Sequence, residues 1–95
     1  LELDEVKTIE AHQHWVVSFS VHPSLPLLLS GSTQEIKLWD WEKGWTCMRT
    51  FRGHTGMIEG VMFNPQDDSP EDITFASVAL DGTAKVASYS LYSIL

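Results

Sequence analysis

Short apolar segments alternate along the chain with clusters of turn-forming residues. Several segments have apolar side chains at every second position, and others run apolar for about four residues, as half-buried and fully buried strands do. These patterns predict strands at Val6–Ile9, Trp15–Val21, Leu27–Ser30, Ile36–Trp39, Thr46–Phe51, Met57–Phe63, Ile73–Val78 and Thr83–Ser88. Pro23, Pro26 and Pro65 fall between strands, where a missing N–H breaks no ladder. Asp81-Gly82 predicts a tight turn. The chain is therefore predicted to be all-β.

The chain also repeats itself. Ala11-His12 recurs as Gly53-His54, and Val21-His22-Pro23 recurs as Phe63-Asn64-Pro65, both at an offset of 42 residues. The offset grows to 47 in the next strand, because the second copy has extra residues in the acidic stretch Gln66–Asp72. Insertions of this kind belong in loops. An internal repeat overrides any strand-by-strand interpretation of the sequence.

A period near 42 residues, with Gly-His at one end and Trp-Asp at the other, is typical of WD40 repeats. His12 and Trp39-Asp40 frame the first copy, and His54 opens the second, whose Trp-Asp pair is replaced. The resemblance implies two four-stranded antiparallel blades of an incomplete β-propeller. The expected organisation is a closing strand of a preceding blade at 1–10, a first repeat at 11–51, and a second repeat with a diverged C-terminal end at 52–95.

In a WD40 blade, a turn Asp orients a His, the His meets a Ser or Thr hydroxyl, and the hydroxyl meets a Trp N–H, so that each buried polar group has a partner. The candidates for these networks are His12, Ser30 (or Ser32), Trp39, His54, Ser77 and Asp81. In the first copy Thr33 or Gln34 stands where the Asp is expected, and in the second Ala87 stands where the Trp is expected. Each network is thus expected to lack one member, at a cost of about 1–3 kcal/mol.

Composition excludes several classes of protein. Six basic against thirteen acidic residues give a net charge of −7, which disfavours nucleic-acid binding. No apolar run approaches the roughly 20 residues of a transmembrane helix, and the start of the chain shows no secretory signal. The single cysteine, Cys47, cannot form an internal disulfide, which fits a reducing, cytoplasmic compartment.

The sequence offers no recognisable catalytic or metal-binding motif. It contains no nucleophile elbow, no Gly-rich phosphate loop and no Cys-His arrangement with a third orienting group. The spacing of the histidines and Cys47 matches no zinc motif. We therefore expect no enzyme activity, no metal and no cofactor.

Two further features have alternative interpretations. Trp41 and Trp45 flank the hairpin residues Glu42–Gly44, and a packed hairpin is favoured over a binding hot spot for a partner. The acidic run from Asp67 to Asp72 is interpreted as a solvated loop, with attraction of a basic partner as the alternative.

The stretch Ile36-Lys37-Leu38-Trp39-Asp40-Trp41-Glu42-Lys43-Gly44-Trp45 resembles the N-terminal propeller of coatomer beta-prime subunits, especially the plant forms, and so does Phe75-Ala76-Ser77. The resemblance implies a role in the COPI coat of vesicles moving between Golgi and endoplasmic reticulum. It implies that coat subunits or dilysine cargo tails are the partners, and that any membrane association is peripheral and through a complex. Acidic side chains of the family meet the cargo lysines at positions that His14 and Thr33 occupy here, with Glu35 nearby. The possible partner surface comprises His14, Thr33, Glu35, Trp41 and Trp45.

We therefore expect a non-catalytic protein-interaction module related to this coat. The alternatives are a WD40 scaffold of another complex, in ubiquitin transfer or chromatin, and a diverged fragment without binding activity. Two blades cannot close a propeller ring, so apolar faces should stay open unless additional blades or self-association cover them. The chain is accordingly expected to be a fragment or to assemble as several copies.

Overall fold

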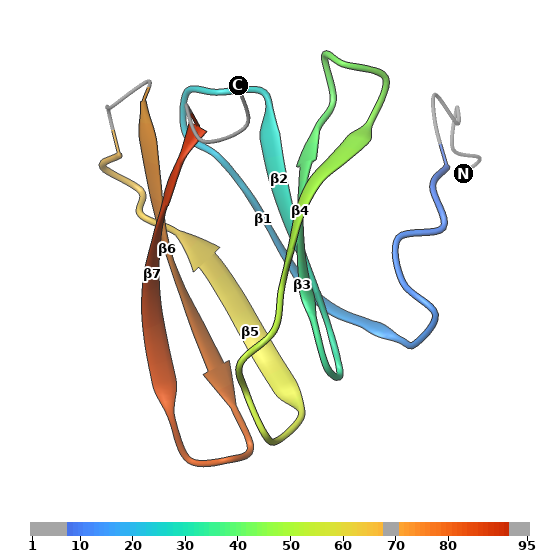
Figure 1. Cartoon of the computed structure of the whole chain (residues 1–95), viewed down its shortest axis with the longest axis vertical. Coiled ribbons are helices and arrows are strands. Elements are labelled where there is room, and N and C mark those ends of the chain that lie inside the picture. Colours follow the sequence, from blue (N-terminus) through green and yellow to red (C-terminus); the bar gives the residue numbers. More distant parts are fainter. Residues whose placement is uncertain (1–7, 68–70, 92–95) are drawn as a thin grey trace, which may run out of the picture.

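Two antiparallel sheets lie side by side in the computed structural model, which describes residues 8–67 and 71–91 (Figure 1). The first sheet contains, in spatial order, β1 (Val16–Val21), β2 (Leu27–Ser32), β3 (Ile36–Asp40) and β4 (Thr46–Phe51). The second contains β5 (Ile58–Phe63), β6 (Asp72–Ala79) and β7 (Ala84–Ser90). Each strand pairs with the next one in sequence, so both sheets are meanders. The prediction of an all-β fold is confirmed.

The structure differs from expectation at one end of the chain and in the number of strands of the second blade, which the resemblance implies to be four. Of the segment Val6–Ile9, residues 6 and 7 lie outside the described residues, and residues 8 and 9 belong to no strand. The first sheet has the four strands expected of a blade, whereas the described residues give the second sheet three. A fourth strand would have to follow β7, and the described residues end at Leu91. Within this part of the chain, β7 therefore pairs along one edge only.

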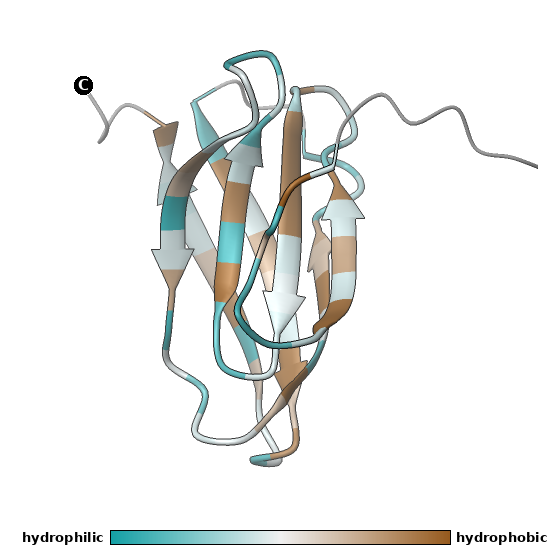
Figure 2. Ribbon diagram, turned by 90° about the vertical axis from the view of Figure 1, so that its right-hand side faces the viewer, coloured by the Kyte–Doolittle hydropathy of each residue, from teal (hydrophilic) through white to brown (hydrophobic). Residues whose placement is uncertain are grey.

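One shared core holds the two sheets together. Leu29 and Leu38 from the first sheet and Ile73 from the second have no exposed surface. The buried core consists of Leu27, Leu29, Ile36, Leu38, Ile58, Val61, Phe63, Ile73, Phe75 and Tyr89. Figure 2 shows apolar segments along strands of both sheets. Side chains of β5 pack closely on Gly31 of β2, where an added Cβ would lie 3.1 Å from Val61 Cγ1. Burial of these side chains is the main source of stability.

Two serines of β1 face the second sheet. The Val61 N–H donates to Ser18 Oγ at 3.2 Å, and the Phe63 N–H donates to Ser20 Oγ at 3.0 Å. These bonds satisfy backbone groups on the edge of β5 that β6 does not pair. Because side chains alternate along a strand, the apolar positions of β1 lie on the opposite face, away from the core. Phe19 is consequently 67% exposed.

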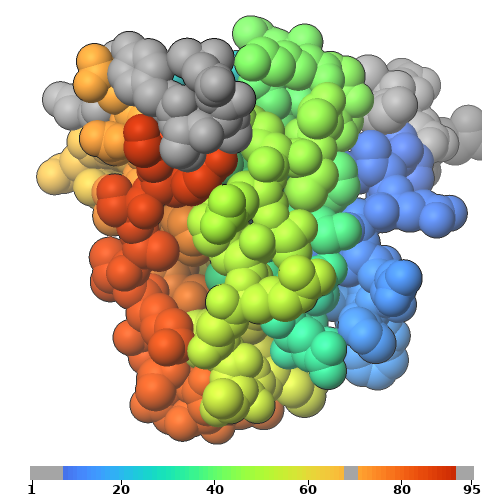
Figure 3. All heavy atoms as spheres, viewed as in Figure 1, coloured from blue at the N-terminus to red at the C-terminus, as the bar shows by residue number. Residues whose placement is uncertain are grey.

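Apolar surface is exposed on both outer sides of the molecule. On the first sheet it lies along β1, where Val21 and Phe19 are more than half exposed. On the second sheet Met62 is 61% and Val86 76% exposed. Figure 3 shows the two sheets as one body, with β7 at one side and the segment preceding β1 at the other. The expectation of open apolar faces agrees with this arrangement. The described residues include no helix long and apolar enough to cross a membrane.

The burial of Leu29 in the core predicts how much its loss lowers the free energy of unfolding. Leu29→Ala removes a fully buried side chain between the sheets, so it should lower the free energy of unfolding by about 2–5 kcal/mol. Urea denaturation followed by circular dichroism measures this change. The matched control is Leu80→Ala, because Leu80 is 63% exposed and its loss should change stability by less than about 0.5 kcal/mol. Equal effects of the two substitutions would contradict the proposed core.

Candidate functional site

Loops from both sheets gather at one end of the molecule, the lower end in Figure 1. They are the segment before β1, the β2–β3 turn and the β4–β5 loop. Together they surround a concavity of about 740 Å³. Its lining residues are Gln13, His14, Thr33, Gln34, Glu35, Arg52, His54, Thr55, Gly56 and Met57. Polar side chains on loops held by a rigid scaffold form a common type of binding site.

A hydrogen-bonded network of four side chains lies beside this concavity in the first sheet. His12 Nε2 is 2.7 Å from Ser30 Oγ, and the Trp39 Nε1–H donates to the same oxygen at 2.9 Å. On the other side of the ring, His12 Nδ1 is 3.1 Å from Glu35 Oε1. The His12 side chain is fully buried. Carboxylate, imidazole, hydroxyl and indole thus satisfy one another, and they fix the loop before β1 on β2.

The carboxylate of this network is the part that the sequence interpretation missed. The expectation that Thr33 or Gln34 leaves the position empty is wrong, because Glu35 fills it. The β2–β3 turn is one residue shorter than the β6–β7 turn of the second sheet. Glutamate has one methylene more than aspartate, and this extra length lets Glu35 reach His12 from the position next to the expected one. Ser32 takes no part in the network, since its hydroxyl donates to the Glu35 carbonyl oxygen at 3.4 Å.

The second sheet contains the corresponding network without an indole. His54 Nε2 is 2.7 Å from Ser77 Oγ, and His54 Nδ1 is 3.1 Å from Asp81 Oδ2. The Thr83 hydroxyl and N–H both donate to Asp81 Oδ1, and the Thr55 N–H donates to Asp81 Oδ2. The hydroxyl of Thr83, together with these other donors, holds the pKa of Asp81 well below its ordinary value. Asp81 therefore ties the β4–β5 loop to the β6–β7 turn as a carboxylate.

Ala87 occupies the register position of the missing indole. It lies opposite Phe75, as Trp39 lies opposite Leu28 in the first sheet. A cavity of about 140 Å³ is found here. Its lining residues are Ile36, Phe51, Arg52, Gly53, His54, Ile58, Phe75, Ser77, Lys85 and Ala87. The change from Trp to Ala thus leaves unfilled space beside the serine of the network.

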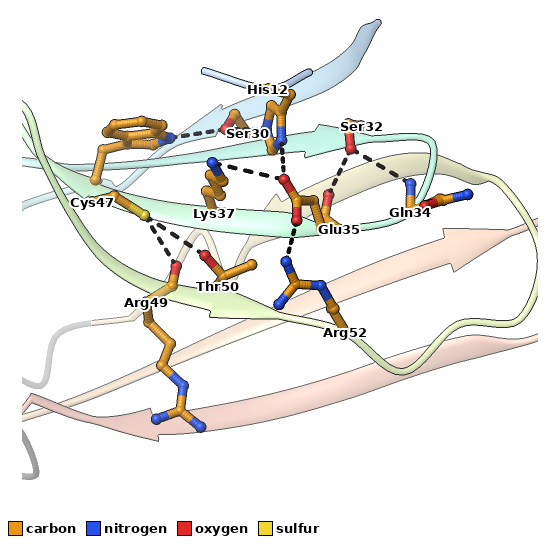
Figure 4. A network of polar contacts seen from close by, with 11 residues as sticks. His12, Ser30, Ser32, Gln34, Glu35, Lys37, Cys47, Arg49, Thr50 and Arg52 are labelled. Atoms are coloured by element: carbon orange, nitrogen blue, oxygen red, sulfur yellow. Dashed lines mark hydrogen bonds and ion pairs between the residues drawn. The ribbon is translucent and has the colours of Figure 1, made fainter. Parts of the chain in front are cut away.

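Glu35 is the centre of the charges around the concavity. Arg52 Nη2 donates to Glu35 Oε2 at 2.7 Å, and Lys37 Nζ lies 3.7 Å from Glu35 Oε1 (Figure 4). Burial raises the pKa of Glu35, but the hydrogen bond with His12 and the charges of Lys37 and Arg52 outweigh burial and hold this pKa below its ordinary value. The carboxylate is therefore ionised and already engaged with two cationic side chains. Neither Arg52 nor Lys37 is among the site residues predicted from the sequence, although Arg52 directly precedes Gly53-His54.

The five residues of the possible partner surface do not form one surface. His14, Thr33 and Glu35 line the concavity. Trp41 and Trp45 belong to the β3–β4 hairpin, at the opposite end of the first sheet (Figure 1). Their ring centroids are 6.2 Å apart, and both rings are half-buried. They pack against each other across the hairpin, where Trp45 has a φ of 60°.

Comparison with known proteins identifies the repeat. The family model described as "WD domain, G-beta repeat" matches residues 3–40 and 45–87. The chain belongs to the WD40 family. WD40 repeats are typically non-catalytic and bind other proteins. In the described residues, no group of three or more His, Cys, Asp and Glu side chains is placed to hold a metal ion.

Coatomer beta-prime subunits are among the relatives found among curated proteins, so the resemblance seen in the sequence is confirmed. The chain is 50% identical over 48 residues to coatomer subunit beta'-2 of Arabidopsis thaliana. It is 50% identical over 50 residues to the subunit beta'-2 of Oryza sativa, and over 46 residues to the subunit beta' of Drosophila melanogaster. These matches include about half of this WD40 chain and 5% of each relative.

The cavity beside Ala87 leads to a first prediction for the site. Ala87→Trp should fill the cavity and donate an indole N–H to Ser77, raising the free energy of unfolding by about 1–3 kcal/mol. Thermal and urea denaturation measure the gain. Ala84→Trp places the same ring at an exposed position of the same strand and serves as the control. A loss of stability in Ala87→Trp would show that the two networks are not equivalent.

The β4–β5 loop leads to a second prediction, which concerns its glycines. A Cβ added to Gly56 would lie 2.5 Å from the Asp81 N atom, whereas one added to Gly53 meets nothing within 4 Å. Because the contact is with backbone, Gly56→Ala must shift the loop and should destabilise the chain by about 1–3 kcal/mol. Gly53→Ala should be neutral or slightly stabilising. Two similar melting temperatures would argue against the close packing of the loop on the β6–β7 turn.

Proposed function

We propose that this WD40 chain is a non-catalytic interaction module of a COPI-type vesicle coat, acting in transport between Golgi and endoplasmic reticulum. The observation that carries this proposal is the 50% identity to coatomer beta-prime subunits from plants and from an insect. The chain would then be cytoplasmic, and it would associate with Golgi or vesicle membranes peripherally, through the complex that it joins.

The geometry of the concavity supports binding of a protein partner there. Its lining comes from loops of both sheets, and the His12 and His54 networks tie these loops to buried strands. A site built in this way changes little on binding, so less conformational entropy is lost. The lining side chains are mainly polar, like those at the rim of protein–protein interfaces.

Its charge favours another coat subunit over a dilysine cargo tail as the partner. Lysines of a tail need free carboxylates, and His14 and Thr33 supply none. The carboxylate of Glu35 is bound to Arg52, whose side chain is 70% exposed and has further N–H donors. An incoming lysine would have to displace Arg52 from Glu35. A carboxylate of a partner protein, in contrast, could bind Arg52 directly.

The experiment compares the two kinds of partner. Immobilised chain should retain purified coatomer subunits, while a fluorescent peptide ending in Lys-Lys-x-x should bind only weakly in polarisation titrations. Retention of none of the coat subunits would overturn the coat role.

The variant Arg52→Ala tests the charge argument. It frees the Oε2 atom of Glu35, so it should tighten binding of the dilysine peptide about 5–10-fold, as expected for one charged hydrogen bond worth roughly 1–1.4 kcal/mol. Adding Glu35→Gln to this variant should abolish the gain. Arg49→Ala is the matched control, because Arg49 lies on β4 over the rings of Phe51 and Tyr89 and does not line the concavity. Tight peptide binding by the unsubstituted chain would instead make cargo tails the partner.

A further inference from the structure

The cavity in the second sheet has the surroundings that hold an indole ring in the first. Ser30 and Ser77 each lie 2.7 Å from the Nε2 atom of a network histidine. Trp39 follows Lys37 by two residues, and Ala87 follows Lys85 by two residues. In the first sheet the indole fills the space between serine and lysine. In the second the same space is a cavity of about 140 Å³.

The walls of this cavity are mainly apolar. Phe51 comes from β4, Ile58 from β5 and Phe75 from β6, so strands of both sheets contribute. Phe75 and Ile58 are almost completely buried and form part of the shared core. A cavity of about 150 Å³ lined by apolar side chains is large enough to bind benzene. An aromatic ring therefore fits here by size and by the character of the walls.

The polar groups at the cavity select the kind of ring. Because His54 Nδ1 lies against the Asp81 carboxylate, it carries the proton, and Nε2 accepts the hydroxyl proton of Ser77. The Ser77 oxygen keeps lone pairs for a donor, which in the first sheet is the Trp39 N–H at 2.9 Å. Lys37 Nζ lies 5.8 Å from the centroid of the Trp39 ring, and Lys85 lines the cavity from the same register position.

We propose that this cavity binds an indole ring, with its N–H donating to Ser77 Oγ and its face near Lys85. The ring is either a tryptophan side chain of a partner protein or a free indole. Arg52 and His54 line both the cavity and the larger concavity. A partner seated in the concavity can therefore insert a tryptophan without rearranging the sheets. This binding does not depend on the coat role.

The probe for the test is indole itself, titrated into the full 95-residue chain and followed by NMR chemical shifts. Indole should bind with a dissociation constant below about 1 mM and shift signals of Ser77 and His54. 1-Methylindole has no N–H donor and should bind about 5–10-fold more weakly. Ser77→Ala should lower the affinity for indole to that for 1-methylindole. Equal affinities for the two compounds in the unsubstituted chain would overturn the assigned hydrogen bond.

Substitution of Ala87 provides the decisive variant. Ala87→Trp should abolish indole binding by occupying the cavity, whereas Ala84→Trp should leave it unchanged. A circular dichroism spectrum of each variant shows that the sheets remain folded. Undiminished binding in Ala87→Trp, or no indole binding at any attainable concentration, would refute the proposal.

N-acetyltryptophanamide distinguishes the two sources of the ring. Its blocked backbone imitates a residue within a partner chain, and binding comparable to that of indole supports a tryptophan side chain as the ligand. Binding of indole without binding of the amide supports a free indole. N-acetylphenylalaninamide lacks a ring N–H. Its affinity should therefore not exceed that of N-acetyltryptophanamide, and Ser77→Ala should not change its affinity.

Discussion

Neither sheet of this protein can bury its apolar face alone. Leu29 and Leu38 lose all their exposure only because β5 and the strands after it lie against the first sheet. The fold therefore depends on contact between two repeats rather than on either repeat by itself, as in other repeat proteins. The serine contacts to β5 and the loops around the concavity all follow from that one interface.

The two histidine networks use the same chemistry, one in each sheet, beside the same concavity. Each joins a loop to a buried strand, and each has an ionised carboxylate at its outer side. In the first network, Glu35 also forms ion pairs with Arg52 and Lys37, so cationic side chains of the same chain largely neutralise its negative charge. The second network lacks the indole, and its surroundings remain available to another ring. The two copies of the motif thus differ in one member: the first contains the indole of Trp39, and the second has a cavity beside Ala87.

Much of this arrangement could be predicted from the sequence, because strand alternation and a repeat period are local signals. His12, Ser30 and Trp39 were brought together by the repeat alone. The role of Glu35 could not be predicted, since it depends on how far a side chain reaches from a shortened turn. The orientation of β1 was equally inaccessible: alternation shows that one face is apolar, but not that the serine face is the one turned toward β5.

The meander order of the strands has a consequence for folding. Within each sheet every strand pairs with its sequence neighbour, so loop closure costs little entropy and pairing is fast. The bonds from Ser18 to Val61 and from Ser20 to Phe63 instead join residues 43 positions apart. During synthesis, the strands of the first sheet can pair before β5 has left the ribosome. The face of this sheet that the second sheet later covers is then exposed to solvent. Ser18 and Ser20 give this exposed face a polar edge at the place where β5 later docks.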